Sequence, residues 1–202
     1  MNVVYIHVCC LHNYVEVFQA LIRSIKQSGL YDVVDEIRCC VLGRMDVRVF
    51  QGDPKIRIHA SSPDVSLYEV FTLNTLHQDC KYEEMNVLYL HTKGITKSDN
   101  LNVKCWVQYM CFFLIHKHKQ CLELRKENDS VGVNLHDDPV LHYSGNFWWA
   151  TSAHIKKLNP CSNASYHSPE FWLTENRIGK HHCMWESNVN HYHQPYPMHL
   201  YI

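Results

Sequence analysis

The sequence predicts a single α/β domain with a mostly parallel central sheet flanked by helices. Short apolar runs rich in β-branched residues alternate with segments of helical periodicity, an order typical of parallel sheets. The chain has 202 residues, the length of one domain, and it contains no internal repeat, low-complexity tract or linker. We therefore expect one domain over residues 1–202.

The first half of the chain predicts the order strand, helix, strand, strand, helix, strand. Gly29 ends the first helix, and Ser66 with Glu69 three residues later has the spacing of a capping box at the start of the second. The last strand, MNVLYL, is almost continuously apolar, as in strands buried on both faces. The predicted elements cover residues 3–8, 14–28, 36–42, 55–59, 66–80 and 85–90.

The second half predicts a long helix and then shorter elements. A helix is expected over 103–124, strands over 130–135 and 145–150, and a helix over 152–158. Pro169 and Glu170 stand where a helix start places proline and an acidic residue. The segment from Lys180 onward is rich in His, Tyr and Pro.

The composition bears on whether the protein binds nucleic acid, a membrane or a metal. The formal net charge is −1, which gives no electrostatic footprint for nucleic acid. The N-terminus does not resemble a signal peptide, and no run of about 18 apolar residues could span a bilayer. We expect a soluble, cytoplasmic protein whose ten cysteines are free thiols. The adjacent pairs Cys9-Cys10 and Cys39-Cys40 lack the spacing of zinc ligands, so no metal site is assigned.

Ligands of open α/β sheets bind at the carboxyl ends of strands, where the topology switches. This rule points to residues 7–13, 91–94 and 136–146. In the second of these segments, Lys93 could stabilise an anionic group, Gly94 would let the backbone approach it, and Thr92 could donate a hydrogen bond. The alternative is an ordinary turn with Lys93 in solvent.

Three sequence segments resemble the pattern of a known family: LYLHTKG at 88–94, HYSGNFWWATSAHIKKL at 142–158 and EFW at 170–172. In this order they resemble a family of GT-A type glycosyltransferases of large DNA viruses of algae and related hosts, some implicated in building capsid glycans. The resemblance implies a GT-A-like, Rossmann-related domain with a donor half (1–95) and an acceptor half (96–202). It implies inverting transfer of a sugar from a nucleotide-sugar donor of the UDP type to a glycan or glycoprotein acceptor, in the host cytoplasm if the protein is viral.

The sequence departs from that family at the metal site. Typical members carry an Asp-x-Asp motif after a core strand, whose carboxylates hold a divalent metal against the donor diphosphate. Here His91, Thr92 and Lys93 occupy this place. Lys93 is therefore expected to stabilise the leaving diphosphate directly and without a metal. Mn²⁺ or Mg²⁺, with His91 as a ligand, stays open as the alternative.

The remaining site residues are assigned by role. Inverting transfer needs a general base, and Glu170 is the first candidate, with Asp138 and its neighbour Asp137 as alternatives. Of Trp148 and Trp149 only one is expected to face the cleft, because adjacent strand residues point to opposite faces. The expected donor-binding residues are His7, Cys9, Ser61, Glu69, Thr72, His91, Thr92, Lys93 and Gly94, and the expected acceptor-binding residues are Ser144, Gly145, Asn146, Trp148 and Trp149.

Two alternatives to an active transferase stay open. One is a catalytically inactive carbohydrate-binding or scaffold module of the same fold. The other is a zinc-dependent hydrolase, which the sequence does not support because it has no His-Glu-x-x-His motif. The segment His191, Tyr192, His193 either completes the diphosphate site, as a late histidine does in many GT-A enzymes, or belongs to a flexible tail.

Overall fold

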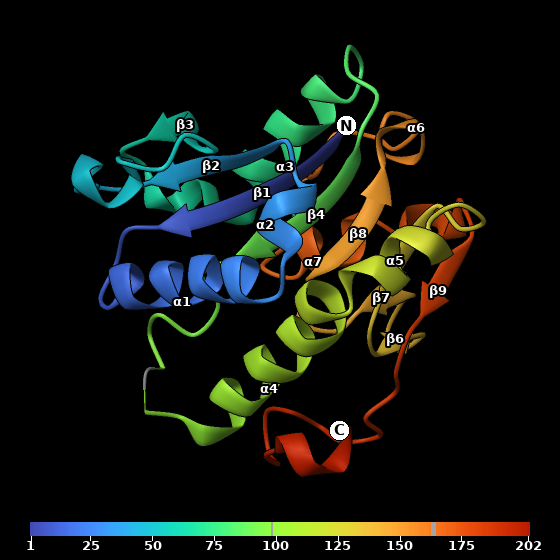
Figure 1. Ribbon diagram of the computed structural model, residues 1–202. Helices are drawn as coiled ribbons and strands as arrows, with labels where there is room; N and C mark the ends of the chain where they lie inside the picture. Colours follow the sequence, from blue (N-terminus) through green and yellow to red (C-terminus); the bar gives the residue numbers. More distant parts are fainter. Residues whose placement is uncertain (98, 163–164) are drawn as a thin grey trace.

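The computed structural model describes residues 1–97, 99–162 and 165–202. Seven strands form one sheet in the order β3-β2-β1-β4-β8-β5-β9, and β8 runs antiparallel to both of its neighbours (Figure 1). The predicted α/β class with a mostly parallel central sheet is thus confirmed. The strands are β1 (Asn2–Cys9), β2 (Glu36–Leu42), β3 (Ile56–Ser62), β4 (Asn86–His91), β5 (Ser130–Gly132), β8 (Trp148–Thr151) and β9 (His181–Cys183), with a separate pair formed by β6 (Leu135–His136) and β7 (His142–Tyr143).

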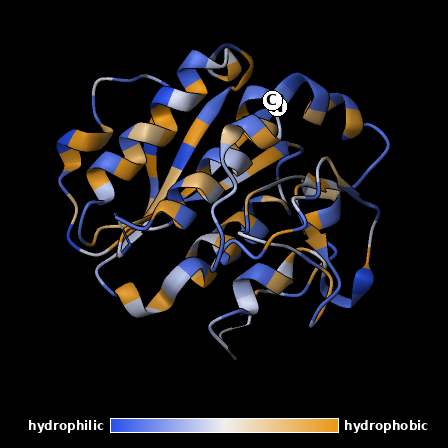
Figure 2. Cartoon of the chain, turned by 90° about the horizontal axis from the view of Figure 1, so that it is seen from below, coloured by the Kyte–Doolittle hydropathy of each residue, from blue (hydrophilic) through white to orange (hydrophobic). Residues whose placement is uncertain are grey.

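Helices pack on both faces of this sheet. Helices α1, α4 and α5 lie on one face, and α3 and α7 lie on the other. Apolar and polar residues are interleaved along the helices, as expected when one side of a helix packs on a sheet (Figure 2). The helices are α1 (Tyr14–Gln27), α2 (Leu30–Val33), α3 (Tyr68–Asp79), α4 (Leu101–Cys111), α5 (His118–Leu124), α6 (Ser152–Ile155) and α7 (Ser168–Trp172), with the π-helix η3 (Phe112–His116) and the 3₁₀ turns η1 (Val47–Phe50), η2 (Val65–Leu67), η4 (Glu175–Arg177) and η5 (Met198–Leu200).

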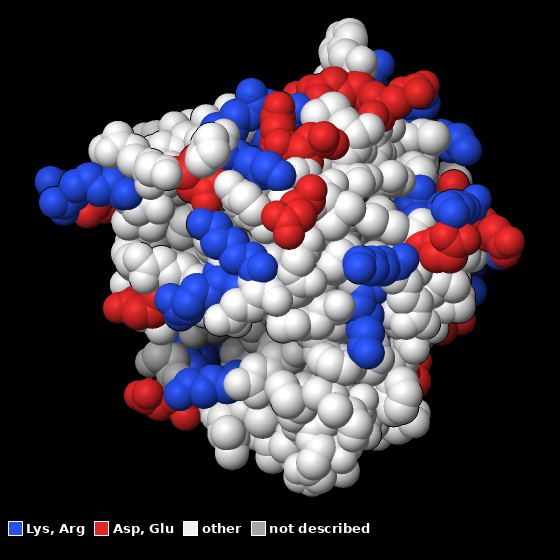
Figure 3. All heavy atoms as spheres, viewed as in Figure 1, with Lys and Arg blue, Asp and Glu red and all other residues white. Residues whose placement is uncertain are grey.

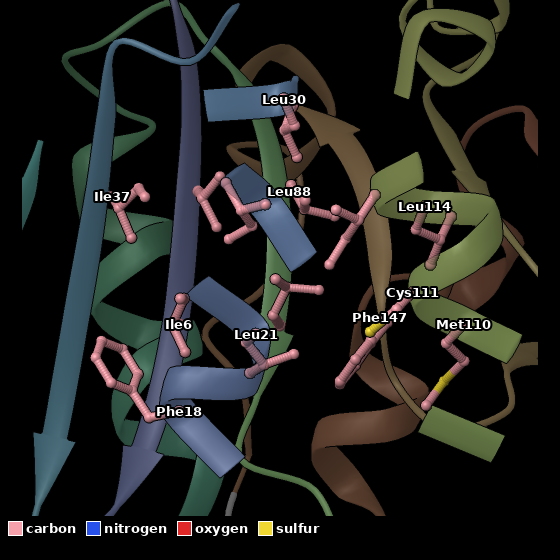
Figure 4. Close-up of a cluster of buried hydrophobic side chains, with 14 of the residues drawn as sticks. Ile6, Phe18, Leu21, Leu30, Ile37, Leu88, Met110, Cys111, Leu114 and Phe147 are labelled. Carbon is pink, nitrogen blue, oxygen red and sulfur yellow. The ribbon is translucent and has the colours of Figure 1, made fainter. Parts of the chain in front are cut away.

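The sheet separates the core into two clusters, and the side chains of β1 point alternately into one and the other. Val4 and Ile6 are fully buried on one face, where Phe18 of α1 packs against them (Figure 4). Val3 and Tyr5, also fully buried, point to the opposite face and join the cluster under α3. Each fully buried apolar side chain stabilises the fold by about 1.5–3 kcal/mol. This double-sided burial explains why the central strands read as continuous apolar runs.

The predicted helix 103–124 is not continuous. Helix α4 passes into the π-helix η3, in which the Lys117 amide donates to the Phe112 carbonyl five residues earlier, at 3.1 Å, and α5 follows. A π-turn inserts one extra residue without changing the apolar character of the buried side. Apolar periodicity therefore could not reveal it.

Several predicted boundaries move for local reasons. Asn134 has φ +48°, so the strand from Ser130 ends before it. Gly145 and Asn146 have φ +94° and +57°, so β8 begins after this turn. Ser66 does not cap α3, because the Asp64 side chain accepts its amide hydrogen in η2 and α3 starts at Tyr68.

The segment after Lys180 adds strand β9, which the polar sequence did not predict. All ten cysteines are free thiols, as predicted, and most are buried. Within the described residues, no helix combines the length and apolar character needed to cross a membrane.

Candidate active site

A pocket of about 430 Å³ lies at the carboxyl ends of β1 and β4, and we call it the strand-end pocket. Strands β2 and β3 lie on one side of β1 and β4 lies on the other, so the topology switches here. This is where ligands bind in open α/β sheets. His7 and His91 are register partners at the two strand ends. The predicted site residues that line the pocket are His7, Cys9, Glu69, His91, Thr92, Lys93, Gly94, Asn146 and Glu170.

Hydrogen bonds hold the two strand ends together. The Thr92 amide donates to the His7 carbonyl at 3.0 Å, and the Cys9 amide donates to Thr92 Oγ1 at 3.2 Å. His7 Nδ1 shares a hydrogen bond of 2.7 Å with the buried Thr72 hydroxyl. Burial lowers the pKa of His7 to about 4, so its ring is neutral at pH 7. Thr72 thus supports the pocket from behind His7 and does not line it.

Lys93 places a cation inside the pocket. Its ammonium lies 4.0 Å from the centre of the Trp106 ring, a cation–π contact. Burial lowers the pKa of Lys93, while the charges of Glu170 and Glu69 oppose this shift. Lys93 lies in a turn, as the alternative expected, but its side chain is half-buried and lines the pocket. An anion bound here would meet a cation that is already partly stripped of water.

Glu69 projects from α3 into the same pocket. Its Oε2 accepts hydrogen bonds from the Tyr89 hydroxyl at 2.7 Å and from the Asn146 amide at 2.8 Å. Its Oε1 lies 3.7 Å from His91 Nδ1. One carboxylate oxygen is therefore fixed by two donors, and the other faces the pocket.

Glu170 projects from the first turn of α7. Its Oε1 accepts a hydrogen bond of 2.7 Å from the Gly145 amide, and its Oε2 lies 3.9 Å from His167 Nδ1. The side chain is 19% exposed, so the carboxylate is held in place and still reachable from the pocket. This geometry suits a proton acceptor, because Oε2 keeps lone pairs free of any close donor among the described residues.

The turn at Gly145 and Asn146 links these groups. Besides its contacts with the two carboxylates, it receives a hydrogen bond of 3.1 Å from His91 Nε2 to the Gly145 carbonyl. A carbonyl can only accept, so Nε2 carries the proton, and burial lowers the pKa of His91 to about 3. Only glycine suits position 145, because a Cβ there would lie 2.5 Å from Met110 Sδ. Asn146 positions the site, since its amide oxygen is taken by Trp148 Nε1 at 2.8 Å.

Some predicted site residues lie elsewhere. Trp148 and Trp149 are 1% and 0% exposed and pack in the two core clusters, so the expectation that one of them faces the cleft is wrong. They lie on a strand covered by helices on both faces, which buries both rings. Asp138 is exposed in a turn outside the pocket, and its neighbour Asp137 pairs with Arg177.

Ser61 and Ser144 also lie outside the lining of the strand-end pocket. Ser61 is exposed near the end of β3, and Ser144 is half-buried, with its amide donating to the Asn134 carbonyl at 3.0 Å. The donor and acceptor roles assigned to these two serines are therefore not supported by their positions.

Three tyrosines form the lip of the pocket, and of these the sequence singled out only Tyr192, within the segment 191–193. Tyr68, Tyr166 and Tyr192 line it and are 54%, 79% and 52% exposed. The rings of Tyr68 and Tyr166 meet edge to face at 6.2 Å. Tyr68 has φ +46° and ψ −157°, a conformation that costs a non-glycine residue about 1–3 kcal/mol. Tyr68 is the first residue of α3, whereas Tyr166 and Tyr192 lie in turns far along the chain, so no sequence spacing could have brought the three together.

The C-terminal segment closes this region. His191 is buried and stacks on Trp106 with ring centres 5.1 Å apart. Asn134 Nδ2 donates to His191 Nε2 at 2.9 Å, so Nδ1 carries the proton in the neutral ring, and burial lowers the pKa of His191 to about 4. His191 Nδ1 and Trp106 Nε1 are both buried without a hydrogen-bond partner among the described residues. The segment is packed against the pocket wall.

The pocket offers few ligands for a metal ion. Across residues 1–97, 99–162 and 165–202, no group of three or more His, Cys, Asp and Glu side chains is arranged to hold a metal ion. Glu69 and His91 are the nearest such pair in the pocket, and both are engaged with the turn at Gly145 and Asn146. The residues present do not fit a metal site built by the protein alone.

The chain belongs to a protein family described as a domain of unknown function (DUF8361), whose family model matches residues 47–192. The match covers well over half of the chain and includes Glu69, Lys93, Gly145 and Glu170, whereas His7 and Cys9 precede it. No curated protein matches the sequence.

Proposed function

We propose that the protein is a glycosyltransferase that takes its sugar from a nucleoside-diphosphate sugar. The observation that carries this proposal is Lys93, a half-buried cation at the topological switch, with Glu69 and Glu170 in the same pocket. A pocket of about 430 Å³ is in the range of small-molecule sites. The resemblance to GT-A type glycosyltransferases of large DNA viruses supports the same reaction.

Lys93 is assigned to the diphosphate. When the bond between the anomeric carbon and the diphosphate oxygen breaks, the electron pair leaves with the diphosphate, and an ammonium in a dry site stabilises that charge. The Trp106 ring, over which the Lys93 ammonium lies at 4.0 Å, holds that ammonium at the wall of the pocket.

Glu170 is assigned as the general base. Its Oε2 would take the proton of the acceptor hydroxyl as that oxygen forms the new bond to the anomeric carbon. Gly145 holds the other carboxylate oxygen, so the base approaches with a fixed orientation. The tyrosines of the lip, Tyr68 and Tyr166, replace the buried tryptophans as the surfaces on which a nucleobase or a sugar could stack.

The proposal is tested with purified protein and a panel of UDP, UDP-sugars, UMP and uridine. We expect UDP to raise the melting temperature in the presence of EDTA, because Lys93 binds the diphosphate without a metal. At 100 times Kd the stabilisation would be about 2.7 kcal/mol. UDP release from UDP-sugars, with and without Mn²⁺ and EDTA, then measures turnover.

The outcomes separate the alternatives. No binding of any nucleoside diphosphate would overturn the proposal. Binding of UDP-sugars without release of UDP would indicate an inactive carbohydrate-binding module. Complete loss of turnover in EDTA, restored by Mn²⁺, would show that a metal and not Lys93 carries the charge of the leaving group.

A further inference from the structure

A second hollow, which we call the apolar groove, lies between α1 and the continuous stretch of α4 and η3. Its volume is about 540 Å³, in the range of small-molecule sites. It shares one wall with the strand-end pocket, formed by His91, Lys93, Gly94, Lys97 and Val103. Its other apolar lining residues are Val17, Ala20, Leu21, Val107, Cys111, Phe112, Met198 and Ile202.

The charged side chains that line this groove are lysines, so its charge is positive. Lys93 and Lys97 stand at the shared wall, and Lys104 projects from α4. None of the described residues that line the groove is Asp or Glu. In the space-filling view the surface is hollowed between α1 and α4, with basic side chains inside the hollow and acidic ones at its outer edge (Figure 3).

The protein neutralises these lysines only in part, because only Glu69 and Glu170 act through their charges on Lys93. Lys93 and Lys97 lie over the rings of Trp106 and Tyr192, at 4.0 and 5.9 Å from the ring centres. No salt bridge joins Lys93, Lys97 or Lys104 to a carboxylate in the described part of the chain. Three cations that make no salt bridge with the described carboxylates, at one end of an apolar channel, complement a ligand with an anionic head and an apolar tail.

We propose that the apolar groove binds an anionic amphiphile, a lipid phosphate whose tail lies between α1 and α4 and whose phosphorylated head lies at Lys93, Lys97 and Lys104. The tail removes apolar surface from water on both sides of the groove. Each buried methylene should strengthen binding by about fourfold. The phosphate gains by replacing water at three ammonium groups that make no salt bridge with the described carboxylates.

This site shares Lys93 with the proposed nucleotide-sugar site but extends away from it between α1 and α4, and its test needs no nucleotide. Octyl, decyl and dodecyl phosphate are titrated into the full chain by calorimetry, each below its micelle concentration. Decyltrimethylammonium, which has a cationic head, tests whether the sign of the head matters. Inorganic phosphate, which has no tail, tests whether the tail matters. We expect affinity to rise about 15-fold for every two methylenes until the groove is full, and the cationic amphiphile to bind at least tenfold more weakly.

Matched variants localise the site. Ala20→Trp fills the groove, whereas Gln19→Trp adds the same ring to an exposed neighbour on α1 that does not line it. Lys104→Glu reverses one charge at the groove, and Lys119→Glu makes the same change on α5 away from it. We expect Ala20→Trp and Lys104→Glu to weaken decyl phosphate binding at least tenfold and the two controls to leave it within about twofold.

The proposal fails if affinity does not depend on tail length, if the cationic amphiphile binds equally well, or if Ala20→Trp binds like Gln19→Trp. A dimer in sedimentation, lost in Ala20→Trp, would show instead that the groove is covered by a second copy of the chain. Lys104 is exposed, so Lys104→Glu should fold even if Ala20→Trp does not, and its affinity alone would decide the role of the charge.

Discussion

Replacing Lys93 by Met is the sharpest test of the strand-end pocket. Met keeps an unbranched apolar stem and removes the charge. A hydrogen bond to a charged group contributes about 1.5–3 kcal/mol, so the Kd for UDP should rise about 10- to 150-fold. Stability should change little, because the lost contact with Trp106, about 0.5–2 kcal/mol, is offset by no longer burying an ammonium.

Calorimetry with UDP and thermal unfolding on the same preparation would measure both quantities. Lys97→Met is the matched control, since Lys97 is exposed on the same loop and should contribute less than about 1 kcal/mol to UDP binding. Burial lowers the pKa of Lys93, so UDP affinity should also fall as the pH rises through that lowered value. This fall should be absent in Lys93→Met. A folded Lys93→Met protein that binds UDP like the wild type would refute the reasoning.

Three further predictions concern the same pocket. Glu170→Gln should keep UDP affinity within about threefold and lower turnover about 100-fold or more. The glutamine oxygen still accepts the hydrogen bond from the Gly145 amide, but the side chain can no longer take a proton. Normal turnover would exclude Glu170 as the base. Gly145→Ala should destabilise the protein by about 1–3 kcal/mol in urea unfolding, because φ is +94° and a Cβ would meet Met110; an unchanged midpoint would contradict this. Burial lowers the pKa values of His7 and His91 to about 4 and 3, so below pH 6.5 the unfolded chain binds more protons than the folded one. The free energy of unfolding should therefore fall as the pH falls toward these values, by about 2–3 kcal/mol for each histidine at pH 4.5. Urea unfolding at pH 7 and 4.5 measures the loss, and His91→Gln should reduce it.

The location of the pocket followed from the sequence because it depends on strand order. Apolar runs identify the parallel strands, and the carboxyl ends of such strands meet at one edge of the sheet. The sequence therefore predicts that His7, Lys93 and the residues between β3 and α3 lie near one another. The position of Glu170 followed from the resemblance and from its place at a helix start.

The acceptor side could not be predicted in the same way. Alternation along a strand says that Trp148 and Trp149 point to opposite faces, but not that helices cover both faces. Whether the turn at Gly145 presents its side chains to a ligand or to neighbouring carboxylates depends on contacts between distant segments. Tyr68 and Tyr166 come into contact, and Tyr192 joins the same lining, only because three distant segments converge at the pocket.

The wall shared by the two hollows has a consequence for ligand binding. Lys93 and Gly94 border both the strand-end pocket and the apolar groove, so ligands in the two sites would interact with the same ammonium. Two occupants that draw on one charge cannot bind independently. If the first ligand changes the affinity of the second by some factor, the second changes the affinity of the first by the same factor. Positive cooperativity would indicate that Lys93 bridges the two anions, and negative cooperativity that they compete for it.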